Sequence, residues 1–311
     1  MIQFDSSKHS EFEVVVIGGG PGGLSAATWC VELGMSTLLI ESNDELGGQL
    51  SWIHNPIMNH LGGVFGNGSD LREVMLKQVA ERDFVLALGR KVDQINHGSV
   101  TLSDGGAIRF KHLIMATGLS RRTIGIDAER VLVGKGILTS GAGQRESVTG
   151  KTVAVIGGGD AAVENALILS EFAEKVFLIH RRETFVARDE MVSQLQSRKN
   201  IDVLLNKTVK SIEGKDVLTS IVIEDVNNRE LTSLAVGNLL IRIGFEPNSS
   251  LLEGKVEMDE KKYIKVDSTF RSSDPSIYAI GDVVSPMSPT ISGAIGAGSI
   301  AAKSIHFRLS N

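Results

Sequence analysis

A repeated glycine-rich pattern constrains the fold of this chain more than any other feature. Residues 14–27 read VVVIGGGPGGLSAA and residues 153–166 read VAVIGGGDAAVENA, which are two copies of one pattern. Each copy opens with a β-branched run that is too short for a helix and typical of a strand buried on both faces of a parallel sheet. Three glycines and then small residues at helical spacing follow. Each copy therefore predicts a strand, a tight turn and a helix.

The glycines of such a turn have a physical role in binding phosphate. In the first copy Gly18 permits the turn, Gly20 lets the backbone approach a pyrophosphate, and Gly23 lets the helix pack closely on the strand. The phosphates then lie at the positive end of the helix. A single turn of this kind also arises for packing reasons alone, but two copies indicate two dinucleotide-binding units. The corresponding residues of the second copy are Gly157, Gly159 and Ala162.

The residue that ends the next strand differs between the two copies. In the first, the run 37–40 leads into Glu41, whose carboxylate can accept hydrogen bonds from ribose hydroxyls, so an adenosine without a 2′-phosphate is expected. In the second, the run 176–179 leads into a histidine and two arginines, and guanidinium groups suit a 2′-phosphate, which predicts NADPH. The alternatives are an exposed basic turn for the arginines and a helix cap or surface position for the histidine. These residues are His180, Arg181 and Arg182.

Charge and cysteine content exclude several classes of function. The formal net charge of −5 gives no electrostatic reason to expect nucleic acid or an anionic membrane as partner. No signal peptide or membrane span is visible, so a cytoplasmic protein is expected. Cys30 is the only cysteine, which rules out an intrachain disulfide, a CxxC redox pair and a cysteine zinc site, and no metal is expected. Any electrons that the protein handles must be carried by something that it binds.

Short strands and turns between the two copies suggest where the chain divides. Four runs separated by glycine turns predict a β-meander. The apolar strand 112–116 ends at Thr117, and a similar strand, 239–243, ends at Gly244. These two strand ends are expected to mark where the chain leaves the first domain and returns to it. The runs of the expected meander are Phe84 to Leu88, Lys91 to Ile95, Ser99 to Leu102 and Ala107 to Phe110.

Six short motifs follow one another along the chain: GGGPGG, GGQL (47–50), ATG (116–118), GGGDAAVE (157–164), HRR (180–182) and GD (281–282). Their order resembles that of the low-molecular-weight thioredoxin reductases of the class II pyridine nucleotide-disulphide oxidoreductases. The resemblance covers nearly the whole chain and implies an α/β protein with two Rossmann-like domains of the three-layer ββα type. It implies a discontinuous FAD-binding domain at 1–117 and 245–311, an inserted NAD(P)H-binding domain at 118–244, and a homodimer.

The resemblance also implies which residues contact the cofactors. Asp282 would bind the ribityl chain of FAD, Gln49 and Asn59 would lie near the flavin ring, and Thr117 and Gly118 would line the hinge side. Asp282 also follows an apolar strand, as ligand-binding residues of open α/β sheets do, although an N-cap is the alternative. The complete expected FAD set is Gly18, Gly20, Gly23, Glu41, Gly48, Gln49, Asn59, Ala116, Thr117, Gly118, Asp282, Thr290 and Ile291. The expected NADPH set is Gly157, Gly159, Asp160, Ala162, His180, Arg181, Arg182 and Arg188.

The chain departs from this family at the dithiol. Thioredoxin reductases carry their CxxC just before the second glycine motif, and the matching stretch here, 134–143, contains no cysteine. Cys30 is no substitute, because apolar neighbours predict a buried inert thiol. The Arg-Gln-Ala of the family is replaced at 289–291, and Arg188 is displaced by one position, which predicts an altered phosphate clamp. A thioredoxin reductase of the usual mechanism is excluded.

A cysteine-free relative exists in the same superfamily. The thioredoxin-reductase-like ferredoxin/flavodoxin-NADP reductases also show GGQLS, but they carry a C-terminal extension over the flavin, whereas this chain ends at Asn311. Trp52 or His54 is the candidate to cover the ring here, with ordinary packing as the alternative. Glu164 matches the family's glutamate near the nicotinamide, with a solvated side chain as the alternative. No catalytic residue is certain, because the flavin carries out the chemistry.

Three hypotheses for function follow. The leading one is an FAD-dependent NADPH oxidoreductase without an active-site disulfide, which reduces an external acceptor such as ferredoxin, flavodoxin, a quinone or oxygen. The second is a flavin-dependent oxidase or dehydrogenase that acts on a small dithiol or a biosynthetic intermediate. The third is a non-catalytic redox-sensing flavoprotein. Rapid bleaching of the flavin by NADPH would favour the first hypothesis.

Overall fold

The computed structural model describes residues 1–6 and 9–310, and the chain divides into two compact units. Unit 1 comprises residues 1–120 and 246–311, of which residues 7, 8 and 311 lie outside the described part, and unit 2 comprises residues 121–245. Each unit is built around its own sheet, whose central strands are parallel, and each contains one of the two glycine turns. The two units are therefore described separately.

The sheet of unit 1 is parallel through its centre and antiparallel at one edge. Strand β2 forms the middle, where the side chains from Val14 to Ile17 are all buried, as their β-branched run predicts. It pairs with β3 on one side and β7 on the other, and β18 adds to β7 as a further parallel neighbour. The strands are β1 (Ile2–Gln3), β4 (Val85–Leu88), β3 (Thr37–Glu41), β2 (Glu11–Ile17), β7 (Ala107–Met115), β6 (Ser99–Leu102), β5 (Val92–Asn96) and β18 (Ile277–Ala279).

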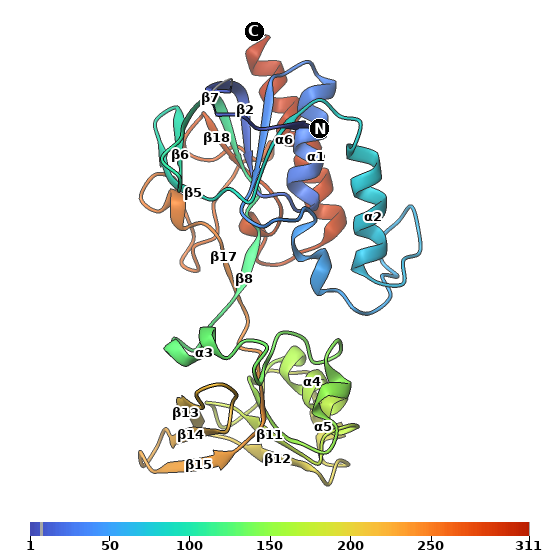
Figure 1. The fold of residues 1–311 in the computed structure, drawn as a ribbon, viewed down its shortest axis with the longest axis vertical. Coiled ribbons are helices and arrows are strands. Elements are labelled where there is room, and N and C mark those ends of the chain that lie inside the picture. The colour runs from blue at the N-terminus through green and yellow to red at the C-terminus, as the bar shows by residue number, and fades with distance from the viewer. Residues whose placement is uncertain (7–8, 311) are drawn as a thin grey trace. The chain divides into compact units, whose positions relative to one another are not determined.

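Two cores lie on opposite faces of this sheet and give unit 1 three layers. Three helices cover one face and strands β5 and β6 fold over the other, as Figure 1 shows. The helices are α1 (Pro21–Glu32), α2 (Gly68–Val79) and α6 (Ile291–Leu309), and short 3₁₀ turns are η1 (Gly48–Trp52), η3 (Ser250–Leu252) and η4 (Gly281–Val284). The predicted α/β fold with a ββα layering is confirmed.

Helices α1 and α6 approach each other closely through small residues. A Cβ atom at Gly298 would lie 2.7 Å from the carbonyl oxygen of Gly22 and 2.8 Å from the backbone nitrogen of Ala26, so only glycine fits there. The Ser25 hydroxyl also donates to the Ile295 carbonyl at 2.8 Å. The small residues of α6 therefore allow the two helices to pack closely.

Unit 2 repeats the three-layer plan with a smaller parallel sheet. Its sheet is covered by α4 and α5 on one face and by an antiparallel meander on the other (Figure 1). The sheet order is β12 (Ile201–Leu204), β11 (Lys175–Ile179), β10 (Thr152–Ile156), β16 (Asn238–Ile241) and β9 (Ile137–Leu138). The other elements are β13 (Lys207–Glu213), β14 (Ser220–Asp225), β15 (Leu231–Ala235), α3 (Asp127–Val131), α4 (Asp160–Ser170), α5 (Asp189–Leu195) and η2 (Arg145–Val148).

Two paired strands carry the chain between the units. Strand β8 (Leu119–Arg121) leads out of unit 1 and pairs with β17 (Phe245–Pro247), which leads back. The backbone nitrogen of Arg122 donates to Gly244, and that of Asn248 donates to Gly118, each at 3.0 Å. Because the outgoing and returning segments hydrogen-bond to each other, they form one two-stranded connection.

The expected four-stranded meander is wrong in two respects. Strand β4 belongs to the parallel sheet, where it pairs with β3, because its apolar side chains pack with the core beneath the meander. The runs expected at 107–110 and 112–116 form a single strand, β7, which continues through Lys111 without a turn. The meander therefore consists of β5, β6 and the first part of β7.

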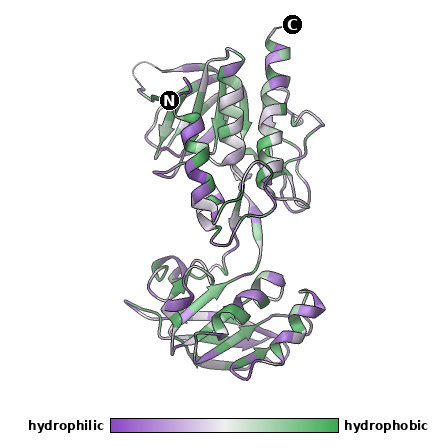
Figure 2. Ribbon diagram, turned by 90° about the vertical axis from the view of Figure 1, so that its right-hand side faces the viewer, coloured by the Kyte–Doolittle hydropathy of each residue, from purple (hydrophilic) through white to green (hydrophobic). Residues whose placement is uncertain are grey.

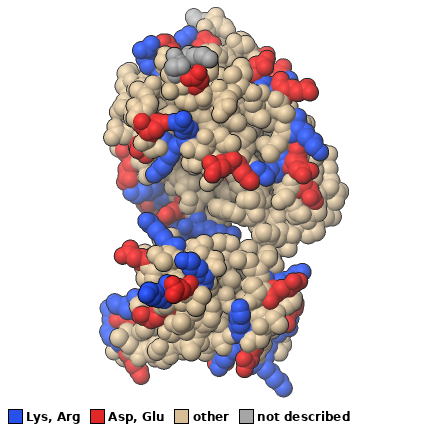
Figure 3. Space-filling model, viewed as in Figure 1, with Lys and Arg blue, Asp and Glu red and all other residues tan. Residues whose placement is uncertain are grey.

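Hydrophobic and hydrophilic residues occupy different parts of the described structure. None of the helices among residues 1–6 and 9–310 is long and apolar enough to cross a membrane. Hydrophobic residues concentrate in the strands of the two sheets, while hydrophilic residues appear along the outer helices and loops (Figure 2). Acidic and basic side chains are interspersed over the visible face of each unit in Figure 3.

Candidate functional site

The first glycine turn is closed on one side and open on the other. Gly18 has a φ of +109°, and a Cβ atom there would lie 2.3 Å from the carbonyl oxygen of Ala116. A Cβ atom at Gly23 would lie 1.8 Å from the carbonyl oxygen of Gly18, so the strand, turn and helix touch through backbone atoms. A Cβ atom at Gly20 would lie 3.9 Å from its nearest neighbour outside the adjoining residues, the Cα of Gly48. The space above Gly20 is thus available to a ligand.

The start of helix α1 fits a bound pyrophosphate. The N-cap residue is Gly20, which has no side chain to accept hydrogen bonds from the first turn, and Pro21 follows it. The backbone N–H groups of a first helical turn need acceptors, and the helix dipole favours an anion there. The open glycine and the uncapped helix start together fit the diphosphate of a dinucleotide.

Glu41 is held rigidly beside this turn. Its Oε2 accepts from the backbone nitrogen of Gly19 at 2.7 Å, and its Oε1 accepts from the backbone and side-chain nitrogens of Asn43, both at 2.8 Å. The residue is buried, and its Oε2 has a further lone pair, because each carboxylate oxygen can accept about two hydrogen bonds. Its geometry is compatible with the expected role of accepting ribose hydroxyls.

Three separate motifs meet at the carboxyl edge of the same sheet. The Gln49 side-chain nitrogen donates to Asp282 Oδ2 at 3.1 Å, and a Cβ atom at Gly118 would lie 3.1 Å from that same nitrogen. Burial raises the pKa of the Asp282 carboxyl, while the hydrogen bond from Gln49 acts in the opposite direction. The structure therefore brings GGQL, ATG and GD together, although they are far apart in sequence.

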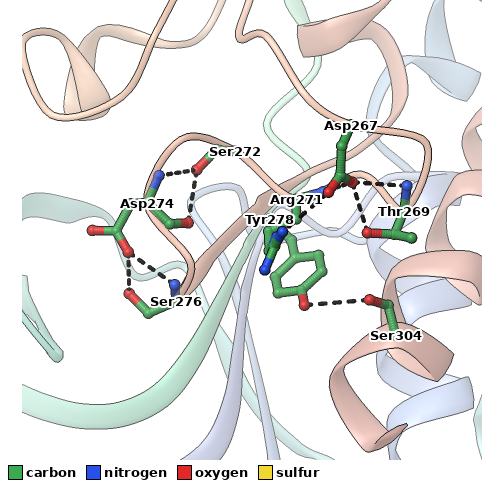
Figure 4. Close-up of polar contacts among 8 residues, drawn as sticks. All are labelled: Asp267, Thr269, Arg271, Ser272, Asp274, Ser276, Tyr278 and Ser304. Carbon is green, nitrogen blue, oxygen red and sulfur yellow. Dashed lines mark hydrogen bonds and ion pairs between the residues drawn. The ribbon is translucent and has the colours of Figure 1, made fainter. Parts of the chain in front are cut away.

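A hydrogen-bonded loop fixes strand β18, which leads into the turn η4 that carries Asp282. Asp267 accepts from Thr269 and from the backbone of Arg271, and a second aspartate, Asp274, accepts from the backbone and hydroxyl of Ser276 (Figure 4). The loop leads into β18, which pairs with β7. The fully buried Tyr278 of β18 then meets the Ser304 hydroxyl of α6 at 3.4 Å. Strand β18 is therefore held in place by the loop before it, by its pairing with β7 and by its contact with α6.

Replacing Asp282 by Ala should weaken FAD retention ten- to a hundredfold. A hydrogen bond to a charged group contributes about 1.5 to 3 kcal/mol, and about 1.4 kcal/mol corresponds to a factor of ten. The FAD dissociation constant after gel filtration measures this loss. Asp93→Ala, which removes an exposed carboxylate from β5 of the same unit, is the matched control. Equal FAD affinity in Asp282→Ala and Asp93→Ala would contradict the assigned contact.

Several other residues expected around the flavin are exposed or cap a helix. Trp52 is 40% exposed, and His54 and Asn59 are exposed in the segment that follows η1. Thr290 is the N-cap of α6, where its hydroxyl accepts from the backbone nitrogen of Gly293 at 3.1 Å. Their roles toward the flavin stay predictions from sequence. The remaining expected residues are placed as follows: Gly48 opens η1, Ala116 and Thr117 follow β7, and Ile291 opens α6.

The second glycine turn in unit 2 repeats the geometry of the first. Gly157 has a φ of +145°, and a Cβ atom there would lie 2.1 Å from the carbonyl oxygen of Arg242 and 2.8 Å from the Cβ of Ala162. Gly159 has no heavy atom within 4 Å of its would-be Cβ. It is also the N-cap of α4 and provides no side-chain cap. This turn therefore fits a second diphosphate group.

His180 lies neither at the surface nor at a helix cap. The ring is buried over Gly158, whose would-be Cβ would lie 2.2 Å from it, and it stacks on Phe185 with 5.5 Å between ring centroids. Its Nε2 lies 3.1 Å from the Thr184 carbonyl oxygen. Burial lowers the pKa of His180, as do the charges of the two arginines that follow it. The surface and helix-cap alternatives are wrong, and the ring is a packed, neutral group at neutral pH.

The three arginines expected to bind a 2′-phosphate are arranged unequally. Arg181 and Arg182 are exposed immediately after β11. Arg188 instead forms an ion pair with Asp160 at the start of α4, with 3.0 Å between Nε and Oδ2. An exposed ion pair of this kind contributes little stability, about 0 to 1 kcal/mol, so a phosphate can compete for Arg188. Glu164, on α4, is exposed.

The stretch that lacks the dithiol forms a closed polar turn. Gln144 Oε1 accepts from the backbone nitrogens of Thr139 and Ser140, and Ser140 Oγ accepts from the backbone nitrogen of Gly143 at 3.0 Å. Cys30 lies in unit 1, fully buried in α1, and burial raises the pKa of its thiol to about 12. The described residues contain no His, Cys, Asp and Glu cluster that could hold a metal ion.

Comparison with known proteins settles the family. Residues 12–298 match the model of the pyridine nucleotide-disulphide oxidoreductases. The chain belongs to this family. It is an NAD(P)H-dependent FAD oxidoreductase of the thioredoxin-reductase type, and this type uses FAD and NADPH. The resemblance inferred from the motifs is confirmed.

Relatives of this oxidoreductase cover almost its full length. Thioredoxin reductase of Escherichia coli O157:H7 is 32% identical over 96% of this chain and 95% of its own. A 34.2 kDa protein in the rubredoxin operon of Clostridium pasteurianum is 28% identical over 95% of this chain and 96% of its own. The crystal structure of Lactococcus lactis thioredoxin reductase superposes with a TM-score of 0.79 at 28% identity, covering 96% of this chain and 99% of that one.

Proposed function

We propose that this oxidoreductase has no active-site disulfide and passes electrons from reduced flavin directly to an external acceptor. FAD is assigned to the predicted domain 1–117 and 245–311, and NADPH to the predicted domain 118–244. The observation that carries the proposal is the combination of two open glycine turns with a single, fully buried cysteine. The acceptor is a one-electron carrier of the ferredoxin or flavodoxin kind, or a small molecule such as a quinone or oxygen.

The residues of the chain supply binding and orientation. When both cofactors are bound, the nicotinamide supplies a hydride and the flavin accepts it. The turn at Gly20 and the carboxylates of Glu41 and Asp282 orient the first dinucleotide, and the turn at Gly159 orients the second. No side chain needs to donate or remove a proton for hydride transfer. Glu164 is exposed, which agrees with the alternative that it is only a solvated side chain.

Anaerobic titration tests this proposal. NADPH should bleach the flavin rapidly, and reduction should end at two electrons per FAD, because the only cysteine has no partner in the chain. A thioredoxin reductase with its disulfide would take up four electrons. Uptake of four electrons, or a protein that binds no FAD, would contradict the proposal. The homodimer and the cytoplasmic location stay predictions from sequence.

The double variant Arg181→Ala/Arg182→Ala should lose most of the preference for NADPH over NADH. Charge-assisted contacts to a phosphate contribute about 1.5 to 3 kcal/mol, so the parent should prefer NADPH about ten- to a hundredfold. Flavin reduction rates at low concentrations of each cofactor measure the ratio. Arg229→Ala, which removes an exposed arginine from the same unit, is the control. A parent protein that uses both cofactors equally would contradict the assignment.

A further inference from the structure

Arg242 lies at the point where the strand order of unit 2 changes direction. It follows β16, and its backbone nitrogen donates to the Ile156 carbonyl oxygen at 2.7 Å. Strand β10 has β11 on one side and β16 on the other, so the carboxyl ends of β10 and β16 flank a topological switch point. Ligands of open α/β sheets bind in the crevice at such a point. Arg242 is therefore on the opposite side of the glycine turn from Arg181 and Arg182.

The guanidinium of Arg242 is held by neutral groups alone. Its Nη1 donates to the Ile241 carbonyl oxygen at 2.8 Å, and its Nη2 donates to the Thr139 carbonyl oxygen at 3.0 Å. Within residues 1–6 and 9–310, no carboxylate forms an ion pair with it, in contrast to Arg188 with Asp160. The two carbonyls occupy only part of the donor fork of a guanidinium. The other N–H groups are left for an acceptor from outside the chain.

A second cation lies close to the first. Burial lowers the pKa of Arg242 to about 10, and the positive charge of Arg121 contributes to the shift. Arg121 is itself half-buried, with its guanidinium 5.7 Å from the centre of the Phe245 ring. Both groups stay charged at neutral pH. A bound anion would offset the burial of the Arg242 guanidinium and its repulsion by the charge of Arg121.

We propose that Arg242, with Arg121 adding positive charge, binds an oxyanion on the β16 side of the second glycine turn. The ligand group is a phosphate or a carboxylate, because these match the planar donor fork of a guanidinium. It belongs either to the nicotinamide half of the dinucleotide or to a separate anionic substrate. Only the first of these sources rests on the proposed function, in which unit 2 binds NADPH.

The test uses the full FAD-loaded chain and the variants Arg242→Gln and Arg242→Lys. Inorganic phosphate is titrated by calorimetry with 2′,5′-ADP at saturation, which occupies the Arg181 side of the site. Phosphate affinity should fall at least tenfold in Arg242→Gln and recover in part in Arg242→Lys, which restores the charge. Affinity for 2′,5′-ADP should be unchanged. Arg122→Ala removes a neighbouring exposed arginine and is the control.

Two further probes distinguish the source of the oxyanion. If nicotinamide mononucleotide loses affinity in Arg242→Gln in parallel with phosphate, the group belongs to the dinucleotide. If mononucleotide binding is unchanged while phosphate and malonate both weaken, the group belongs to a separate anionic substrate. Parent-like binding of all three probes in a folded, FAD-loaded Arg242→Gln protein overturns the inference. A parent that binds no 2′,5′-ADP refutes the proposed NADPH site, while phosphate alone still tests Arg242.

Discussion

Cys30 in the native protein should react with a disulfide reagent about a thousandfold more slowly than an exposed cysteine. Burial raises the pKa of its thiol from 9.0 to about 12, so the reactive thiolate is about a thousandfold rarer, and full burial also denies the reagent access. Release of the coloured thiol from Ellman's reagent measures the rate. Unfolding in guanidinium should expose the thiol and restore rapid reaction.

The double variant Cys30→Ala/Ser193→Cys provides the matched control, because it carries one thiol at an exposed position of unit 2. It should react rapidly while folded. The single variant Cys30→Ser should reduce acceptors within about twofold of the parent rate, since the thiol only packs in the core. Rapid labelling of the folded parent, or loss of turnover in a folded, FAD-loaded Cys30→Ser protein, would give the thiol a redox role and favour a disulfide reductase.

Two alanine substitutions should remove the two cofactors selectively. Gly20→Ala should lower FAD affinity at least tenfold, and Gly159→Ala should lower NADPH affinity at least tenfold while FAD stays bound. Each new methyl group enters space that is empty in the protein but is needed for close approach of a pyrophosphate. Flavin absorbance after gel filtration measures the first effect, and the NADPH dependence of flavin reduction measures the second.

Thermal unfolding separates these effects from damage to the fold. Neither substitution should lower the stability of the cofactor-free protein, because no backbone atom blocks the new methyl group. Gly23→Ala should destabilise it strongly, since its Cβ would lie 1.8 Å from the Gly18 oxygen. Gly237→Ala, at the amino end of β16 with no atom near its would-be Cβ, is the neutral control. FAD bound equally by Gly20→Ala and the parent would place the pyrophosphate elsewhere.

Elements with a strong local signal could be predicted from the sequence. The β-branched runs before Gly18 and Gly157 form the central strands of their sheets, because short continuous apolar runs are buried on both faces. The positive φ of both glycines follows from the same pattern. Strand pairing was harder, as β4 shows. Its apolar run is compatible with a strand in a meander and with a strand in a parallel sheet. Only its contacts with residues distant in sequence determine which of the two it forms.

Side-chain roles at the candidate site depended on such distant contacts. Glu41 and His180 end equivalent strands, but each is buried because Gly19 or Gly158 leaves room above it. Helix α2 was not predicted, although Asn67 caps it by accepting from the backbone of Ser69 and Asp70. The cationic position of Arg242 was also missed. The sequence signal that could have identified it is a single charged residue within the otherwise apolar run 239–243.

The pairing of β8 with β17 bears on how such a protein can arise and be re-engineered. A segment whose two ends lie side by side can be inserted into a host loop without separating the strands of the host. In unit 1, the Thr117 hydroxyl donates to the Asn248 carbonyl oxygen and the Ser120 hydroxyl donates to the Asn248 side chain, each at 2.7 Å. The chain segments of unit 1 on either side of the insertion are therefore hydrogen-bonded to each other. Unit 2 can therefore be exchanged as one cassette, which allows a lineage to change what unit 2 binds while unit 1 stays intact.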